Sequence, residues 1–179
     1  VFGKWEKQKK LTPLDEDIAA THLEEIMDTL AKAKFIQYEI SNFCLPGFES
    51  KHNSSYWHGK KYLGLGPAAH SYDGKARQYN QRHNIKYIQG LKANVLPCTK
   101  EILTKEDQIN EVILTQLRLM EGINCLNLHE LHAFDLQNSR KPQIDEVIHL
   151  KVLEYNGDFL RLTPKGKLLA DFITEKLII

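Results

Sequence analysis

The sequence lacks closely spaced cysteines and long apolar runs. Its three cysteines, Cys44, Cys98 and Cys125, lie far apart, and no two of them form a CxxC pair. This spacing disfavours a disulfide framework and a cysteine-based cluster site, and it fits a reducing compartment. No apolar run approaches the roughly 20 residues that a membrane-spanning helix needs. The opening residues, VFGKWEKQKK, also lack the apolar core of a secretion signal. We therefore expect a cytoplasmic protein.

An excess of charge of either sign is also absent. The 24 Lys and Arg residues nearly balance the 23 Asp and Glu residues, so the formal net charge is +1. A domain that binds nucleic acid usually carries a basic stripe, so we expect no nucleic-acid partner. The chain does have a composition typical of globular proteins, with 42% hydrophobic and 26% charged residues over 179 positions. That length suits one ordinary domain or two small ones.

The first part of the chain alternates between helical and strand-forming patterns. A helix is predicted over residues 12–34, with Thr12 as its cap and Pro13 in its first turn. The β-rich stretch 35–41 follows, and a strand directly after a helix is typical of an α/β layer. A second strand is expected at 62–65.

The stretch that follows predicts a hairpin and a short helix. Asp73-Gly74 stands between two β-friendly runs, which is a hairpin signal. A helix is expected at 85–92, and Pro97 closes this part of the chain.

A different pattern begins near residue 100. Thr104 and Asp107 have the spacing of a capping box, and a long amphipathic helix follows them as far as Gly122. Shorter helices are predicted at 126–134 and 143–154. An Asn156-Gly157 turn, a strand at 159–162 and a last helix that ends near Leu177 complete the chain. Three helices, a β-wing and a closing helix predict a winged-helix-like domain over 100–179, preceded by an α/β part over 1–99.

The densest group of chemically capable side chains lies between Tyr38 and Tyr72. This stretch is expected to consist mainly of loops, and loops more often bind than form a core. It contains the motif HNxxYW, formed by His52, Asn53, Tyr56 and Trp57 around two serines. The alternative is a capped loop whose aromatic residues only pack.

The motif and its surroundings resemble a known family. HNxxYW, with YEISNF before it and YLGLGPAAHS after it, is similar to the radical-SAM family of HemW-type heme chaperones and oxygen-independent coproporphyrinogen III oxidases. Residues 111–122 and LTPKG at 162–166 resemble two further family stretches. The family's CxxxCxxC and GGTP-type motifs are absent from these residues. The resemblance therefore implies the C-terminal portion only: the last β/α elements of a partial barrel, then a winged-helix-like domain.

The resemblance also implies roles for individual residues. His52 becomes the candidate axial ligand of a heme iron, Asn53 its orienting partner or a propionate contact, and Tyr56 and Trp57 flat faces for a porphyrin. His58 and His70 are alternative ligands, although such histidines are more often surface or hydrogen-bonded residues.

Further candidates concern a second cofactor and metal binding. Gly64, Gly66 and Ala69 are small residues that could line a SAM cavity, with a tight turn as the simpler alternative. His129 and His132 are three residues apart on a predicted helix, and we interpret them as solvated.

The sequence is compatible with three functions. The first is part of a heme chaperone whose full-length form holds a [4Fe–4S] cluster and SAM, binds heme or a porphyrin and passes heme to a client hemoprotein of respiratory type. The second is part of an oxygen-independent coproporphyrinogen III oxidase. The third is a winged-helix binding module, which the acidic helix at 143–154 disfavours for DNA. Without the cluster motif, the chain itself is not expected to catalyse SAM cleavage.

Overall fold

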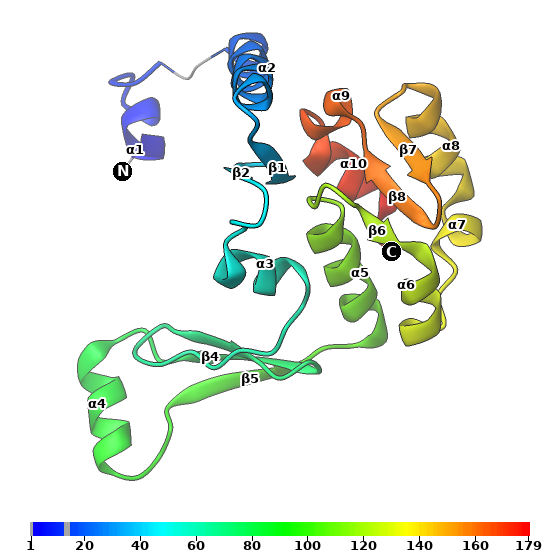
Figure 1. Ribbon diagram of the computed structural model, residues 1–179. Helices are drawn as coiled ribbons and strands as arrows, with labels where there is room; N and C mark the ends of the chain where they lie inside the picture. The colour runs from blue at the N-terminus through cyan, green and yellow to red at the C-terminus, as the bar shows by residue number, and fades with distance from the viewer. Residues whose placement is uncertain (1, 13–14) are drawn as a thin grey trace. The chain divides into compact units, whose positions relative to one another are not determined.

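The computed structural model describes residues 2–12 and 15–179 and divides the chain into two compact units, Val1–Glu49 and Ser50–Ile179. Both units mix helices with small antiparallel sheets (Figure 1), and this mixed fold class agrees with the prediction. The predicted boundary near residue 100 falls inside the second unit, within the strand Cys98–Ile102, and remains a prediction. No helix among the described residues is both long and apolar enough to cross a membrane.

The first unit consists of two helices and a hairpin. Helices α1 (Phe2–Lys7) and α2 (Glu16–Lys32) precede strands β1 (Ile36–Glu39) and β2 (Asn42–Cys44), which pair antiparallel. The buried carboxylate of Glu39 closes the turn by accepting hydrogen bonds from Ser41 N and Asn42 Nδ2, at 3.1 and 2.6 Å.

The predicted start of the second helix was wrong. The cap of α2 is Asp15, whose side chain accepts from the backbone N–H groups of Asp17 and Ile18, so Thr12 is not the cap. The predicted role of Pro13 falls outside the described residues. The only strand pairing of β1 in the described chain is antiparallel, so a parallel barrel unit stays a prediction about a longer protein.

The second unit begins with a short helix and a three-stranded sheet. Helix α3 (Lys51–Trp57) is followed by β3 (His70–Tyr72), β4 (Ala76–Asn80) and, after helix α4 (Asn84–Lys92), by β5 (Cys98–Ile102). The strand order is β3-β4-β5, all antiparallel. Figure 1 shows α4 at one end of the β4–β5 ribbon and α5 beyond the other.

Two predictions for this part need correction. The HNxxYW motif lies on helix α3, capped by Ser50 through its bond to Asn53 N at 3.2 Å, and not in a loop. Residues 62–65 form no strand; a single bridge joins Tyr62 to Tyr72. The Asp73-Gly74 hairpin is confirmed: Asp73 Oδ1 accepts from Lys75 N and Ala76 N at 2.9 and 2.7 Å. These backbone hydrogen bonds lower the pKa of Asp73.

The rest of the second unit packs helices around a second three-stranded sheet. Its elements are α5 (Lys105–Gln116), β6 (Ile123–Asn124), α6 (Cys125–His132), α7 (Leu136–Ser139), α8 (Lys141–His149), β7 (Leu153–Asn156), β8 (Phe159–Leu162), α9 (Pro164–Lys167) and α10 (Ala170–Leu177). The strand order is β6-β8-β7. The predicted set of three helices, a β-wing and a closing helix is compatible with this strand order. The assignment of a winged-helix domain remains a prediction.

Helix α5 carries the centre of this core. Ile109, Ile113 and Leu117 recur every four residues and are 1%, 0% and 0% exposed. Burial of each such side chain contributes about 1.5–3 kcal/mol. The Thr104–Asp107 capping box predicted at its start is confirmed. The helix ends at Gln116, short of the predicted end at Gly122, and Met120 beyond it is exposed.

The last two predicted helices also differ in detail. The helix expected at 143–154 ends at His149, so Glu154 belongs to strand β7. The single closing helix is divided into α9 and α10 at residues 168–169. Gly166 packs so closely on Val152 that an added Cβ would lie 1.8 Å from its carbonyl oxygen.

Candidate functional site

Helix α3 presents the HNxxYW motif on two different sides. Residues four apart on a helix lie above one another, whereas adjacent residues diverge. His52 and Tyr56 therefore share a side, with ring centroids 5.0 Å apart and planes at 88°. Asn53 and Trp57 occupy another. The helix thus separates Asn53 from the imidazole that it was expected to orient.

The His52 imidazole is accessible. The residue is exposed, and its ring contact in the described chain is the edge-on packing with Tyr56, which is itself 40% exposed. No hydrogen bond to either ring nitrogen of His52 occurs among the described residues. A neutral imidazole with free nitrogens can bind a metal ion as a single ligand.

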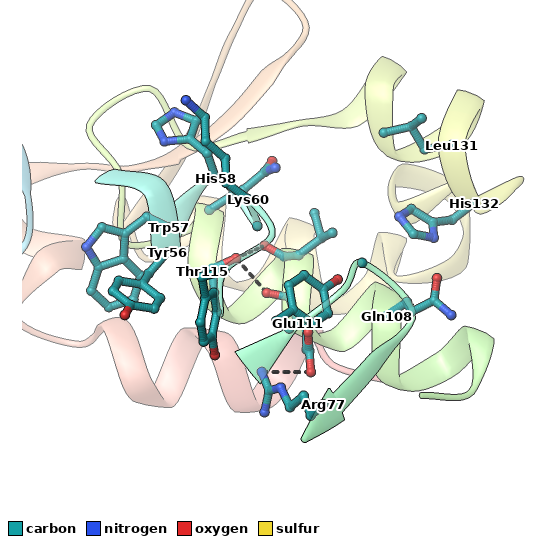
Figure 2. A pocket seen from close by; sticks show the side chains of 16 residues that line it. Tyr56, Trp57, His58, Lys60, Arg77, Gln108, Glu111, Thr115, Leu131 and His132 are labelled. Carbon is teal, nitrogen blue, oxygen red and sulfur yellow. Dashed lines mark hydrogen bonds and ion pairs between the residues drawn. The ribbon is translucent and has the colours of Figure 1, made fainter. Parts of the chain in front are cut away.

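Tyr56 connects this exposed side to a cavity of about 430 Å³. The cavity lies between the end of α3, the β3–β4 hairpin, α5 and α6 (Figure 2). Its aromatic wall continues from Tyr56 to Tyr62, with centroids 4.8 Å apart, and from Tyr62 to Tyr72 at 6.2 Å. Burial raises the pKa values of Tyr62 and Tyr72. His52 does not line the cavity.

An ion pair lies in the cavity wall. Arg77 Nη2 of β4 and Glu111 Oε1 of α5 are 2.7 Å apart, and Figure 2 shows the pair with the Glu111 side chain reaching from α5 to the hairpin. Burial raises the pKa of the Glu111 carboxyl, and the neighbouring guanidinium partly opposes this rise. Sequence reasoning assigned no role to Arg77, and the Glu111 position stood out only through the family resemblance.

Trp57 is the most enclosed aromatic residue of the motif. The guanidinium carbon of Arg118 lies 5.4 Å from its ring centroid, which is a cation–π arrangement. Its indole Nε1 is buried and has no hydrogen-bond partner in the described chain. Buried N–H groups are normally paired. The unpaired indole N–H of Trp57 is therefore available to donate a hydrogen bond to a group that enters beside it.

The other candidate histidines make contacts that do not involve His52. His58 is held by Ser54 O, 2.7 Å from its Nδ1, and by Glu121 Oε1, 3.4 Å from its Nε2. His70 is exposed on β3 and packs on Tyr79 with centroids 5.8 Å apart. His132 lines the cavity and is half-buried. Burial, with Lys105 nearby, lowers its pKa.

The small residues after α3 have structural contacts. A Cβ on Gly64 would lie 2.0 Å from the carbonyl oxygen of His70, and Gly66 has a φ of +100°. Asn80, only 2% exposed, donates through Nδ2 to Gly66 O at 2.9 Å. The Ala69 carbonyl accepts from Asn80 N at 2.9 Å. Asn80, which sequence reasoning missed, therefore fixes this turn.

Neither a cluster site nor another metal centre is formed by the described residues. Cys44 and Cys125 are buried, and Cys98 is exposed, with all three thiols free. Burial raises the pKa of Cys44 and raises that of Cys125 to about 11. No three His, Cys, Asp or Glu side chains in the described ranges gather as metal ligands. A [4Fe–4S] cluster, which takes several thiolates, does not fit this part of the chain.

Known proteins are similar to this chain in both sequence and fold. Residues 103–169 match the family model of the HemN C-terminal domain. Two relatives named heme chaperone HemW are 35% identical over 96% of this chain in Mycobacterium tuberculosis and 32% identical over 100% in Lactococcus lactis. They are matched over 42% and 47% of their own lengths, so the chain spans less than half of these relatives.

Two further similarities extend this set. A mouse mitochondrial protein named radical S-adenosyl methionine domain-containing protein 1 is 45% identical over 96% of this chain and 42% of its own length. The solved structure of the radical SAM enzyme coproporphyrinogen III oxidase (HemN) from Escherichia coli matches with a TM-score of 0.67 and 16% identity, over 87% of this chain and 40% of that one. At that identity the match concerns the fold. The chain therefore belongs to the HemW/HemN family of radical SAM proteins and represents the portion that carries the HemN C-terminal domain.

Proposed function

We propose that this chain binds heme at helix α3, with His52 as the ligand of the iron, and that the whole protein delivers the heme to a client hemoprotein. The observation that carries the proposal is the accessible His52 imidazole, packed edge-on against Tyr56 at 5.0 Å within the HNxxYW motif. The relatives named heme chaperone HemW support the same reading.

The side chains around α3 fit one axial bond and an aromatic contact. A bound heme supplies an iron that accepts a neutral imidazole nitrogen, and His52 has both ring nitrogens free of hydrogen bonds in the described chain. Tyr56 limits the rotation of that ring, and its own exposed face is available to an apolar plane. Trp57 lines the adjacent cavity and contributes its unpaired indole N–H.

The remaining assignments are proposals of lower rank. Asn53, on the other side of α3, is proposed to contact a propionate rather than to orient His52. His70 is the second candidate ligand, since it is exposed on β3. Gly64, Gly66 and Ala69 are proposed to line a SAM cavity in the whole protein, which would hold SAM and a [4Fe–4S] cluster through residues outside this chain.

The oxidase alternative has weaker support. It rests on the likeness to the HemN structure, and at 16% identity that likeness concerns the fold alone. A winged-helix module that binds DNA is disfavoured because Asp145 and Glu146 of α8 are acidic and form ion pairs with Lys141 and Lys176. Turnover of coproporphyrinogen III by the full-length protein with its cluster would favour the oxidase over the chaperone.

The heme proposal is tested by titrating hemin into the chain and following the Soret band. We expect a shifted band for the unchanged protein and a weaker association for His52→Ala, because the variant lacks the iron–nitrogen bond. A tenfold weakening corresponds to about 1.4 kcal/mol. His129→Ala is the matched control, because His129 is also an exposed histidine on a helix. His70→Ala tests the second candidate. Identical spectra and affinities for all four proteins would remove His52 from the site.

A further inference from the structure

The near-neutral net charge hides a strongly basic segment. Between Asp73 and Glu101 the sequence contains no acidic residue, and it contains six basic ones: Lys75, Arg77, Arg82, Lys86, Lys92 and Lys100. This segment is the β4–α4–β5 portion of the second unit. The rest of the chain is correspondingly acidic, so the charge is distributed unevenly between different parts of the protein.

Most of these cations have no acidic partner. Arg77 pairs with Glu111 and Lys100 with Asp73. The other four, Lys75, Arg82, Lys86 and Lys92, are exposed and form no ion pair with any described residue. Their positive charges are therefore exposed to solvent and available to an anionic partner.

An apolar surface lies in the middle of this basic segment. Ile85, Ile88 and Leu91 recur every three residues, so they share one side of α4, and they are 60%, 50% and 45% exposed. Val95 and Leu96, directly after the helix, are 60% and 48% exposed. Gly90 lies on the opposite side of α4 and packs on Pro97, where an added Cβ would be 2.7 Å from Pro97 Cγ. The helix thus turns its aliphatic side away from the chain.

We propose that α4 and the Val95–Leu96 segment form a docking surface for an anionic lipid bilayer. Aliphatic side chains can enter the boundary between headgroups and acyl chains while Lys and Arg contact the phosphate groups around them. The position of α4 at the end of the β4–β5 ribbon, beyond the strands and opposite α5 (Figure 1), leaves this side clear within the second unit. The association is peripheral, with shallow insertion of a nine-residue helix.

A bilayer fits this surface better than an acidic protein. The unpaired cations lie in the β3–β4 turn, in the β4–α4 connection and on α4. They do not converge on one point, which suits a continuous negative plane more than a single acidic side chain. The aliphatic residues carry no polar group that could fix the register of a protein partner.

Vesicle co-sedimentation tests the electrostatic part. The chain should bind vesicles that contain phosphatidylglycerol, bind phosphatidylcholine vesicles far less, and lose binding as salt is raised. Each basic residue near an anionic surface contributes about 1 kcal/mol, or roughly fivefold in partitioning. Lys86→Gln with Lys92→Gln should therefore weaken binding about 25-fold. The control pair, Lys10→Gln with Lys165→Gln, removes two exposed lysines elsewhere and should change it less than about twofold.

A second pair of variants tests the apolar part. Ile88→Asn should weaken vesicle binding, whereas Leu126→Asn on α6, at a similar exposure of 55%, should not. Equal binding to neutral and anionic vesicles, equal effects of test and control variants, or binding to an acidic polypeptide without binding to vesicles would each overturn the proposal. Because hemin binding is read separately through the Soret band, failure here is distinct from failure of the heme proposal.

Discussion

Replacement of Gly64 by alanine should destabilise the second unit more than the loss of one ordinary contact would. The new Cβ would lie 2.0 Å from the His70 carbonyl oxygen, whereas an ordinary contact begins at 3.4 Å. The backbone of residues 62–65 must therefore move away from β3 by about 1.4 Å. That movement weakens the two backbone hydrogen bonds between Tyr62 and Tyr72, both 2.9 Å long. Overpacking costs about 1–3 kcal/mol and a weakened hydrogen bond about 1 kcal/mol, so we expect a loss of about 2–4 kcal/mol in unfolding free energy.

The measurement uses the intrinsic fluorescence of the chain. Trp5 and Trp57 are its two tryptophans, so in a Trp5→Phe background the urea transition reports Trp57 and hence the second unit. Gly3→Ala is the control, since nothing lies within 4 Å of its new Cβ, and it should leave this transition unchanged. A Gly64→Ala protein that unfolds at the same urea concentration as its parent would refute the argument that this backbone approach is rigid.

Two further predictions use the same transition. Ile113→Ala removes a fully buried side chain from α5 and should cost about 2–5 kcal/mol, whereas Leu114→Ala, at 52% exposure, should stay within about 0.5 kcal/mol; similar losses for both would contradict the assigned core. Burial raises the pKa of Glu111 above its ordinary value of 4.5, so the folded state binds more protons than the unfolded state, and its stability relative to Glu111→Gln should fall as the pH rises through the raised pKa. A difference between the two proteins that increases with pH would contradict this sign.

Local signals explain which elements the sequence revealed. The Thr104–Asp107 capping box and the Asp73-Gly74 hairpin depend on residues that are neighbours in the chain, and both form as predicted. The stripe of Ile109, Ile113 and Leu117 is similarly visible because its spacing is that of a single helix. In each case the chemistry that forms the element lies within the element.

Elements without an apolar side were missed. Helix α3 has no buried residue, so KHNSSYW shows no helical stripe, and its one signal is the Ser50 cap. Strand β5 is exposed along its whole length and shows no alternation. Its pairing with β4 arises from the hairpin arrangement across α4, which no short sequence window contains.

The site was predicted in part. The family resemblance singled out His52, Tyr56 and Trp57, but the cavity that receives the latter two depends on the long-range approach of α5 and the β3–β4 hairpin. Arg77 and Glu111 are 34 positions apart, and only the fold brings them to 2.7 Å. The basic segment around α4 was readable from the sequence, since a count of charge along the chain reveals it where the total of +1 does not.

The different environments of the three thiols offer a practical handle. Cys44 and Cys125 are buried with raised pKa values, and Cys98 is exposed at the start of β5, two residues after Leu96. Because thiolates react and buried thiols do not, a maleimide dye should attach at Cys98 first, with no engineered cysteine required. An environment-sensitive fluorophore attached at Cys98 would lie beside the proposed lipid-docking surface. A change in its emission would report in real time that this surface has bound a bilayer.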